Sequence, residues 1–517
     1  MVKRYFSLLL VVVALPIVSQ IQRVDGQLQK LLVAESAITS LYVEPVDNNK
    51  IVEAAIKGML KELDPHSTYL TSDEVGRSNE SLQGKFDGIG IQFNMAEDTL
   101  FIVQPISDGP SEKVGILPGD RIVSVNDTII AGVEMSDQDI MRRLRGPKGT
   151  LVKLGIVRRG ISDILFFDVI RDKIPVKTLD ASYIAAEGIG YIKISTFGLT
   201  TVEEFVQALT DLKSKGASKL ILDLQGNGGG YLMSAVGMAN EFLLKDQLIV
   251  YTEGRRSPKN EYSAEGLGNF LEEKLIVLID EYSASAAEIV AGAVQDWDRA
   301  LIVGRRSFGK GLVQRPVEFN DGSMIRLTIA NYYTPSGRSI QKPYGKEIKY
   351  GLELNERLNN GELMSADSIH FPDSLKYTTL TLGRTVYGGG GIMPDYFVPL
   401  DTTRYTRFHR ELSAKGAILQ ANLAYVDMNR KALQRKFKDF ETFDREFYVD
   451  REFIDLLIKK AGDLDVKFNQ EQYDSSLPML KIQLKALVAR DLWTLSDYYK
   501  IINRLDDSVE TAVELLR

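Results

Sequence analysis

The stretch Val277 to Gln314, VLIDEYSASAAEIVAGAVQDWDRALIVGRRSFGKGLVQ, decides the fold. The apolar run at 275–279 predicts a buried strand, and the apolar spacing from Ile289 to Trp297 predicts a helix. Ser283 and Ser285 therefore lie at a strand-to-helix turn. Backbone amides are free at such a turn, and the helix dipole favours negative charge there.

The sequence allows two interpretations of Ser285. With Glu288 three residues later it has the pattern of a capping box, and most such serines only cap helices. Alternatively, Ser285 is a nucleophile whose oxyanion is stabilised by the neighbouring backbone amides.

A nucleophilic serine needs a base, and the chain has only three histidines. His66, His370 and His409 lie in settings that do not suggest catalysis. Lysine is the other known base, provided that burial lowers its pKa. Lys310 lies between two glycines, which let the backbone turn tightly. The alternative for Lys310 is a solvated loop lysine.

This segment resembles the carboxy-terminal processing peptidases, the PDZ-containing, S41-type, tail-specific proteases that use a Ser–Lys dyad. The resemblance places the nucleophile on Ser285 and not on Ser283, and places the lysine 25 residues later on Lys310. It also implies that Gln314 orients the lysine. Ala287 departs mildly from the family, which usually has serine there.

A glycine-rich loop, DLQGNGGG at Asp223–Gly230, follows another predicted strand. A phosphate-binding loop would need the Walker spacing and its Gly-Lys-Ser/Thr end, which are absent. The resemblance implies that this loop supplies one oxyanion amide, from Gly229 or Gly230. It assigns the second donor to the amide of Ala286.

Three further features lie near these motifs. Asp296 matches an acid found in some family members and is equally interpretable as a helix-surface carboxylate. Arg338 could pair with a carboxylate, but the default interpretation is a solvated arginine. The segments 333–341 and 389–395 are predicted to form structural turns near the site.

Composition restricts the function classes. The 517 residues include 63 basic and 70 acidic side chains, so the net charge is −7, which argues against a general nucleic-acid binder. There is no cysteine, which excludes disulfides, thiolate chemistry and cysteine-based metal sites. The chemistry inferred above requires neither a metal nor another cofactor.

The first 20 residues resemble an export signal. A basic start precedes an apolar run at 5–18, which is shorter than the roughly 20 residues of a membrane-spanning helix. Residues 1–20 are predicted to be a signal peptide or an uncleaved anchor. The protein is expected in the periplasm, or membrane-associated on its periplasmic side if the segment is retained.

The chain is predicted to be a multidomain α+β protein. The expected parts are an N-terminal helical region at 21–84, a PDZ domain at 85–172, a peptidase core at 173–400 that opens with a linker at 173–182, and a helical domain at 401–517. Strand-like runs, the last of them at 324–329, alternate with helical runs in the core, which predicts an α/β layer fold. The resemblance implies the architecture shared with Clp peptidases and crotonases.

The PDZ resemblance rests on the order of short strands and glycine turns. Gly88, Ile89, Gly90 and Ile91 match the carboxylate-binding loop, whose exposed amides hold a chain terminus while the ligand adds as a strand. The alternative is a small β-rich spacer with an occluded groove.

These observations together predict a serine endopeptidase that cleaves exported proteins near their C-termini. Its expected partners are proteins or peptides with free C-termini, which the PDZ domain binds or gates. The helical regions are candidates for homo-oligomer or adaptor contacts. The rival hypothesis is a catalytically silent PDZ scaffold, which would have no need for Ser285, Lys310 and Gln314 together.

Overall fold

The computed structural model describes residues 26–96, 98–345 and 350–517, so the predicted export segment lies outside the described residues. The chain forms two compact units. One comprises Met1–Thr71 with Pro316–Leu327, and the other comprises Ser72–Arg315 with Thr328–Arg517. Within the described ranges, no helix has both the length and the apolarity needed to cross a bilayer.

The first unit contains two helices and a short β-ladder. Its elements are α1 (Gly26–Leu41), α2 (Asn48–Lys61) and β1 (Thr68–Leu70). Strand β1 pairs antiparallel with the first three residues of β18 (Met324–Tyr333). Helix α1 buries none of its residues, and its apolar side chains Leu28, Leu31, Leu32 and Ile38 are exposed.

The PDZ domain is built on one antiparallel sheet, with the strand order β3-β4-β5-β7-β8 and β6 beside β5. Helix α5 covers it, and Ser136 caps α5 by accepting from the Asp139 amide. The elements are α3 (Ser72–Gln83), β2 (Lys85–Gly88), β3 (Ile91–Ala96), β4 (Thr99–Pro105), α4 (Pro110–Lys113), β5 (Arg121–Val125), β6 (Thr128–Ile129), α5 (Asp137–Leu144), β7 (Leu151–Val157), β8 (Leu165–Ile170) and β9 (Asp172–Pro175).

Much of the segment predicted as a linker, 173–182, belongs to two strands. Strand β9 pairs with β2 to form a ribbon, and β10 (Leu179–Ala186) is the edge strand of the peptidase sheet. Ala181 and Tyr183 are the buried residues of β10, and their alternation with less buried neighbours is the pattern of a half-buried strand, which the linker prediction overlooked.

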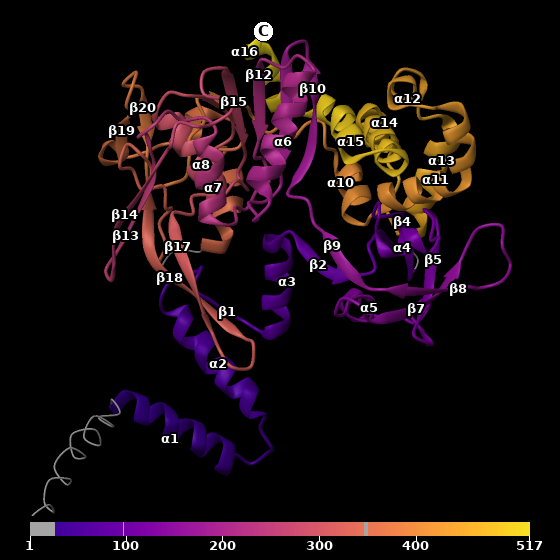
Figure 1. Ribbon diagram of the computed structural model, residues 1–517, viewed down its shortest axis with the longest axis horizontal. Helices are drawn as coiled ribbons and strands as arrows, with labels where there is room; N and C mark the ends of the chain where they lie inside the picture. The colour runs from indigo at the N-terminus through magenta and orange to yellow at the C-terminus, as the bar shows by residue number, and fades with distance from the viewer. Residues whose placement is uncertain (1–25, 97, 346–349) are drawn as a thin grey trace, which may run out of the picture. The chain divides into compact units, whose positions relative to one another are not determined.

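The peptidase core is a six-stranded sheet with the order β10-β11-β12-β15-β16-β21. Strand β10 is antiparallel to β11, and the other neighbours are parallel. Figure 1 shows three strands of this sheet, β10, β12 and β15. The remaining elements of this layer are β11 (Ile189–Ile194), α6 (Thr201–Ser214), β12 (Lys219–Asp223), α7 (Leu232–Asn240), β15 (Lys274–Ile279), α8 (Ala286–Asp296), β16 (Leu301–Gly304) and β21 (Tyr396–Phe397).

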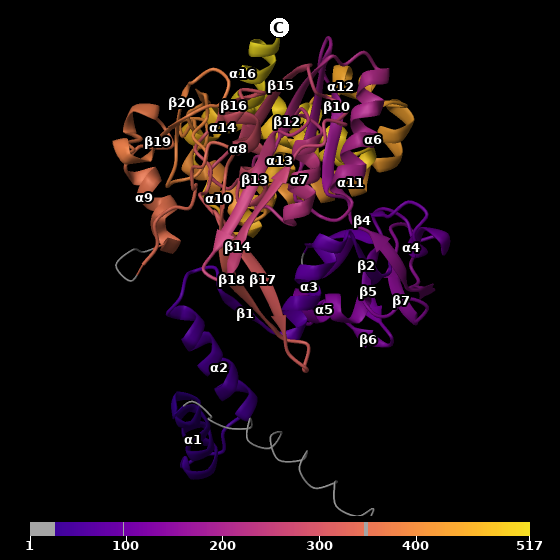
Figure 2. The same ribbon diagram turned by 60° about the vertical axis from the view of Figure 1, so that its left-hand side comes forward.

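Both faces of this sheet are covered, which explains why its central strands are apolar throughout. On β15, Val277 packs with residues of α6, α7 and α8, whereas its neighbours Ile276 and Leu278 face the opposite cluster. That second cluster includes Val509 and Ala512 of α16 (Asp507–Leu516). The last helix of the chain therefore completes the peptidase core (Figure 2).

The C-terminal region is helical, as predicted, and has a core of its own. Its helices before α16 are α10 (Arg407–Ala414), α11 (Ala417–Lys436), α12 (Phe440–Glu446), α13 (Arg451–Asp463), α14 (Gln470–Leu492) and α15 (Leu495–Ile502). Stacked and edge-on aromatic rings fill that core; Tyr425 and Phe453, for example, stack with ring centroids 3.8 Å apart.

The elements that remain flank the peptidase core. They are β13 (Leu248–Gly254), β14 (Ser257–Ser263), β17 (Leu312–Glu318), α9 (Glu353–Asn359), β19 (Lys376–Thr378) and β20 (Thr385–Tyr387). Strand β13 pairs with β14 and with the end of β18, which was predicted as a strand of the main α/β layer but belongs to this second sheet.

Candidate active site

Ser285 lies at the turn between β15 and α8, as the sequence predicted. Its backbone has φ 53° and ψ −110°, a conformation that non-glycine residues rarely adopt and that is typical of functional turns. The serine is half-buried and caps α8, while the next residue, Ala286, begins the helix. This geometry places the hydroxyl beside the free amides of a helix start.

Ser283 has a different environment, which favours Ser285 as the reactive serine. The Ser283 side chain is fully buried. Its hydroxyl donates to the carbonyl of Leu224 at 2.8 Å and accepts from the amide of Asp280 at 2.9 Å. Ser283 therefore ties the glycine loop to the end of β15.

Glu288 connects the serine turn to the lysine loop. Its Oε2 accepts from the amide of Ser285 at 2.8 Å and from the amide of Lys310 at 2.9 Å. Its Oε1 accepts from the Ser307 hydroxyl at 2.5 Å and from the Gly309 amide at 2.7 Å. The capping box is thus formed, but its carboxylate also fixes the loop that carries the lysine.

Burial raises the pKa of Glu288 to about 7, while the four hydrogen bonds it accepts act in the opposite direction. All four partners are donors, so they favour the ionised form. A proton on either oxygen would have to displace one of them.

Tyr332 joins the same two residues from the other side. Its hydroxyl lies 3.1 Å from the carbonyl oxygen of Ser285 and 2.7 Å from that of Lys310. The side chain is buried, which raises the pKa of Tyr332 well above its usual value and keeps the hydroxyl protonated. The backbone amides of Ser285 and Lys310 therefore share one acceptor, the Glu288 carboxylate, and their carbonyl oxygens both lie near one donor, the Tyr332 hydroxyl.

Lys310 is half-buried, and its Nζ donates to Oε1 of Gln314 at 3.1 Å. This is the contact expected for a glutamine that orients the lysine. An amide oxygen carries no charge, so it positions the amine without the Coulombic stabilisation that a carboxylate would give an ammonium.

The two turns predicted near the site lie against the lysine loop. Gly311 donates to Oε1 of Gln341 at 2.9 Å. A Cβ on Gly309 would lie 3.1 Å from the amide nitrogen of Gly391 and from Cβ of Lys342, and Gly309 has φ 86°. Glycine is required at this position both by the conformation and by the close backbone.

The glycine loop packs directly on the serine turn. A Cβ on Gly229 would lie 2.8 Å from Cβ of Ser285 and 3.0 Å from the amide nitrogen of Ala286. Gly229 is buried and donates to Oδ1 of Asn227 at 2.8 Å. Gly230 is exposed, and among the described residues no group accepts a hydrogen bond from its amide.

Asp296 and Arg338 are not surface residues, so both surface interpretations are wrong. Their side chains are fully buried and form an ion pair at 2.8 Å. Asp296 also accepts from the amide and hydroxyl of Ser336 at 2.9 and 2.7 Å, and Arg338 donates to Gln295 at 2.7 Å. Neither sequence spacing nor residue type distinguishes a buried pair from two solvated charges.

The predicted carboxylate loop of the PDZ domain is less accessible than expected. Gly88, Ile89 and Gly90 are buried, and Ile91 begins β3. A Cβ on Gly88 would lie 2.9 Å from Phe86. Strand β3 pairs with β4 on one side, and within the described part of the sheet its other edge has no partner strand. That edge is where an added peptide strand would bind.

The layered α/β core and the strained serine turn define a serine-type peptidase. Residues 188–350 match the model of peptidase family S41, residues 88–163 match the PDZ domain, and residues 17–74 match the N-terminal domain of the activating protease CtpB. Residues 408–494 match a family of unknown function.

Curated relatives give the same result. The chain is 36% identical over 355 residues to the carboxy-terminal processing protease CtpB of Bacillus subtilis (strain 168), covering 68% of this chain and 72% of that protein. It is 40% identical over 309 residues to the carboxy-terminal-processing protease of Bartonella bacilliformis, covering 59% and 70%. The chain belongs to the carboxy-terminal processing protease family of S41 peptidases.

Among solved structures, the photosystem II D1 C-terminal processing protease is 26% identical, covers 72% of this chain and 87% of that chain, and has a TM-score of 0.37.

Sequence reasoning identified the serine turn, the lysine loop and the glycine loop, but it missed the residues that hold them together. Glu288 was visible only as half of a capping box, and no local signal marked Tyr332 or Asn227. Their contacts join segments that are distant in sequence, so a motif search does not find them.

Proposed function

We propose that this protein is an endopeptidase that cleaves exported proteins near their carboxyl termini, with Ser285 as the nucleophile and Lys310 as its base. The observation that carries the proposal is the shared pair of partners. Glu288 Oε2 accepts from both amides, and the Tyr332 hydroxyl lies within hydrogen-bond distance of both carbonyls. The side chains of Glu288 and Tyr332 thereby hold the backbones of two residues that are distant in sequence close to each other.

In the proposed reaction, neutral Lys310 Nζ takes the proton of Ser285 Oγ as Oγ bonds to the scissile carbonyl carbon. The tetrahedral intermediate collapses, the C–N bond breaks, and the lysine ammonium returns the proton to the leaving amine. Lys310 Nζ, neutral again, then takes a proton from water as the water oxygen bonds to the acyl carbon. The ester C–O bond breaks, the lysine ammonium returns the proton to Ser285 Oγ, and the new carboxyl terminus is released. The proposed steps draw on no group beyond the side chains and water.

The oxyanion is assigned to the amides of Ala286 and Gly230. Gly229 is the weaker candidate because its amide already donates to Asn227. The exposure of Gly230 and the contact of its neighbour with Ser285 support this choice. Each such donor contributes about 3 kcal/mol to the barrier reduction.

Replacing Gln314 with glutamate tests the role of Lys310 as a base. The substitution is nearly isosteric, but it places a negative charge where Oε1 lies 3.1 Å from the amine. A carboxylate at that distance raises the pKa of an amine by about 1 to 3 pH units. We expect the alkaline rise of kcat/KM in Gln314→Glu to move to higher pH by about that amount.

Initial rates between pH 6 and 11 on one peptide measure this change. Gln341→Glu is the matched control, because Gln341 binds the Gly311 amide rather than the lysine amine. A Gln314→Glu profile that coincides with the wild-type profile would show that the activity-limiting base is not Lys310.

Action near a carboxyl terminus predicts that the terminal carboxylate is recognised. The protein contains a PDZ domain, and PDZ domains bind peptides through a free sheet edge and a terminal carboxylate. A charge-assisted hydrogen bond contributes about 1.5 to 3 kcal/mol, so we expect kcat/KM to fall roughly 10- to 100-fold for a carboxamide.

The measurement compares two peptides of one sequence, one ending in a carboxylate and the other in a carboxamide. The cleaved bond is identified by mass spectrometry. Equal kcat/KM values would exclude recognition of the terminus and leave a general endopeptidase. Binding of both peptides without cleavage would favour the scaffold alternative.

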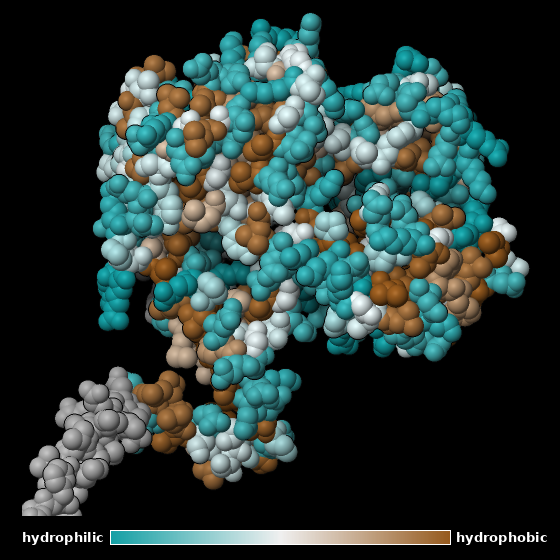
Figure 3. Space-filling view, in the orientation of Figure 1, coloured by the Kyte–Doolittle hydropathy of each residue, from teal (hydrophilic) through white to brown (hydrophobic). Residues whose placement is uncertain are grey.

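Export and self-association stay predictions. The signal or anchor at 1–20 lies outside the described residues, and a periplasmic location follows only if that segment directs export. The described part of the N-terminal helices exposes apolar residues, including Leu28, Leu32 and Val33 of α1 (Figure 3). We propose that a second copy covers this face, and the mass in solution by light scattering would test it.

A further inference from the structure

Asp506 joins the C-terminal helices to the glycine loop. Its Oδ1 caps α16, accepting from the amides of Ser508 at 2.8 Å and Val509 at 3.3 Å. Its Oδ2 accepts from Nε2 of Gln225 at 2.9 Å. Gln225 lies at the start of the loop that ends against Ser285. One carboxylate therefore contacts both a terminal helix and the peptidase loop.

The backbone N–H and C=O of Gln225 and its side-chain Nε2 all form hydrogen bonds. Its amide donates to Oδ1 of Asp223 at 2.8 Å, and its carbonyl accepts from Nζ of Lys193 at 2.6 Å. Lys193 also forms an ion pair with Asp223 at 3.0 Å. Contacts with Asp223 and Lys193 thus restrain the backbone of Gln225, and Asp506 adds a further restraint through the side chain.

The restraint on Gln225 reaches the oxyanion loop over a few residues. The next amide, Gly226, donates to Oδ1 of Asp280 at 2.9 Å. Three residues further, the backbone of Gly229 contacts Ser285 so closely that an added Cβ would lie 2.8 Å from the serine Cβ. A small movement at Gln225 therefore changes the position of the donors relative to the nucleophile.

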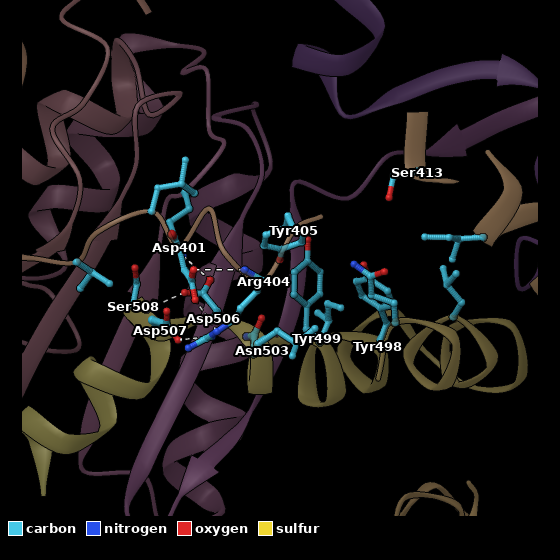
Figure 4. Close-up of a pocket in the computed structure, with 18 of the residues that line it drawn as sticks. Asp401, Arg404, Tyr405, Ser413, Tyr498, Tyr499, Asn503, Asp506, Asp507 and Ser508 are labelled. Carbon is cyan, nitrogen blue, oxygen red and sulfur yellow. Dashed lines mark hydrogen bonds and ion pairs between the residues drawn. The ribbon is translucent and has the colours of Figure 1, made fainter. Parts of the chain in front are cut away.

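The Asp506–Gln225 contact borders a cavity. Both residues line a space of about 630 Å³ between the peptidase core and the C-terminal helices, together with Arg305 and Arg404. Figure 4 shows Asp506, Asp507 and Ser508 on the wall of this space, beside Arg404. If Asp506 is replaced, water can take its place beside Gln225, but the hydrogen bond that holds the Gln225 side chain to the protein is lost.

We propose that Asp506 is a positioning residue for the oxyanion loop, acting through Gln225. The C-terminal segment then contributes to the rate of the peptidase reaction, in addition to packing on its sheet. This inference rests on the proposed function, since it assumes that Gly230 and Ala286 stabilise the oxyanion. It concerns a contact between the end of the chain and the loop after β12.

A positioning role has a specific kinetic signature. Misplaced oxyanion donors weaken transition-state binding and leave ground-state binding of the peptide unchanged. Displacing a catalytic group by 1 Å reduces the reaction rate by up to about 100-fold. Because the loop retains its other restraints, we expect a smaller effect, a fall in kcat of about 10-fold at constant KM.

The experiment uses the full chain and four single variants. Asp506→Ser keeps a good N-cap for α16 but is too short to reach Gln225. Gln225→Leu removes the side-chain amide at similar volume. Asp506→Asn can restore the contact, because the Gln225 amide can turn and accept from the new amide group. Asp507→Asn is the adjacent control, since Asp507 bonds only Arg404 and its own helix among the described contacts.

We expect Asp506→Ser and Gln225→Leu each to lose about 10-fold in kcat at unchanged KM, and their double variant to lose no more than either alone. Asp506→Asn should lose no more than about threefold, and Asp507→Asn should match the wild type. Thermal unfolding midpoints measured alongside show whether each variant is folded at the assay temperature.

Three results would overturn the inference. They are a wild-type kcat in folded Asp506→Ser, a change confined to KM, and losses that add in the double variant. Ser285→Ala is included to separate this outcome from a failure of the proposed function. If Ser285→Ala keeps full activity, the proposed nucleophile is wrong; if only the Asp506 variants behave as wild type, the positioning role alone is wrong.

Discussion

Ser285→Ala and Lys310→Ala should each abolish measurable peptide hydrolysis, with kcat reduced by about 10⁴- to 10⁶-fold. The nucleophile and its base act in one step, so removing either prevents acyl-enzyme formation. The double variant should therefore be no less active than the single variants. Rates measured with high enzyme concentrations over days would quantify the residual hydrolysis.

Ser283→Ala is the matched control for this experiment. It also removes a serine hydroxyl, but one that lies two residues before Ser285, is buried and forms hydrogen bonds with Leu224 and Asp280. The loss leaves buried partners unsatisfied and should cost about 1 to 3 kcal/mol of unfolding free energy. Hydrolysis should persist below the lowered unfolding temperature. The assignment would be reversed if Ser283→Ala were inactive while folded and Ser285→Ala were active.

The parts of the site that sequence reasoning found are those encoded by contiguous residues. The apolar run before Ser285 and the small residues after it predict a strand-to-helix turn, and Gly309 and Gly311 mark a tight loop around Lys310. The alternation of strand-like runs with helical runs along the core predicted the α/β layer. These signals are local, and the local structure agrees with the global fold.

What remained hidden depends on contacts between distant segments. Tyr332 comes from β18, which sequence reasoning assigned to the main layer, yet its hydroxyl joins the two dyad residues. A solvated position was the default for Arg338 and one of two interpretations of Asp296, because charged side chains are usually exposed. Burial of such a pair depends on which helix and turn meet in three dimensions.

The interpretation of the C-terminal region shows the same limit. Helical periodicity correctly predicted helices there, but it gave no indication that α16 packs on β12 and β15 of the peptidase sheet. Amphipathic spacing identifies an apolar face and does not identify its partner. For α16 the partner is the sheet itself.

Glu288→Gln should disable the site by a different route from loss of the dyad. Each carboxylate oxygen accepts two hydrogen bonds, so whichever way the glutamine amide turns, its NH₂ group faces two donors. If the NH₂ group faces Ser285 and Lys310, both of their amides lose the acceptor that they share. If it faces Ser307 and Gly309, the Ser307 hydroxyl can turn to accept from it, and the Gly309 amide next to Lys310 is left unpaired. Each unpaired amide costs about 1 to 3 kcal/mol. We expect kcat to fall at least about 100-fold while Ser285 and Lys310 remain present.

Glu281→Gln is the matched control, because Glu281 is also buried near the turn but bonds the side chain of Arg305 and none of the dyad amides. Its amide oxygen can still accept from Arg305, so kcat should change much less than in Glu288→Gln. Equal losses in the two variants would show that any buried carboxylate here is needed merely for folding.

The pH dependence of Glu288 separates stability from activity. Its folded pKa of about 7 lies above the ordinary 4.5, so between these values the folded state holds a proton that the unfolded state has released. The contribution of Glu288 to stability therefore falls as pH rises through this window, by about 3 kcal/mol in all. Activity should rise over the same window, because the ionised carboxylate accepts all four hydrogen bonds. The unfolding free energy, measured with urea, should thus fall from pH 4.5 to 8 while kcat rises. In Glu288→Gln, the part of each pH dependence that comes from Glu288 should be absent. An unfolding free energy and a kcat that change in the same direction in the wild type would contradict this role for the carboxylate.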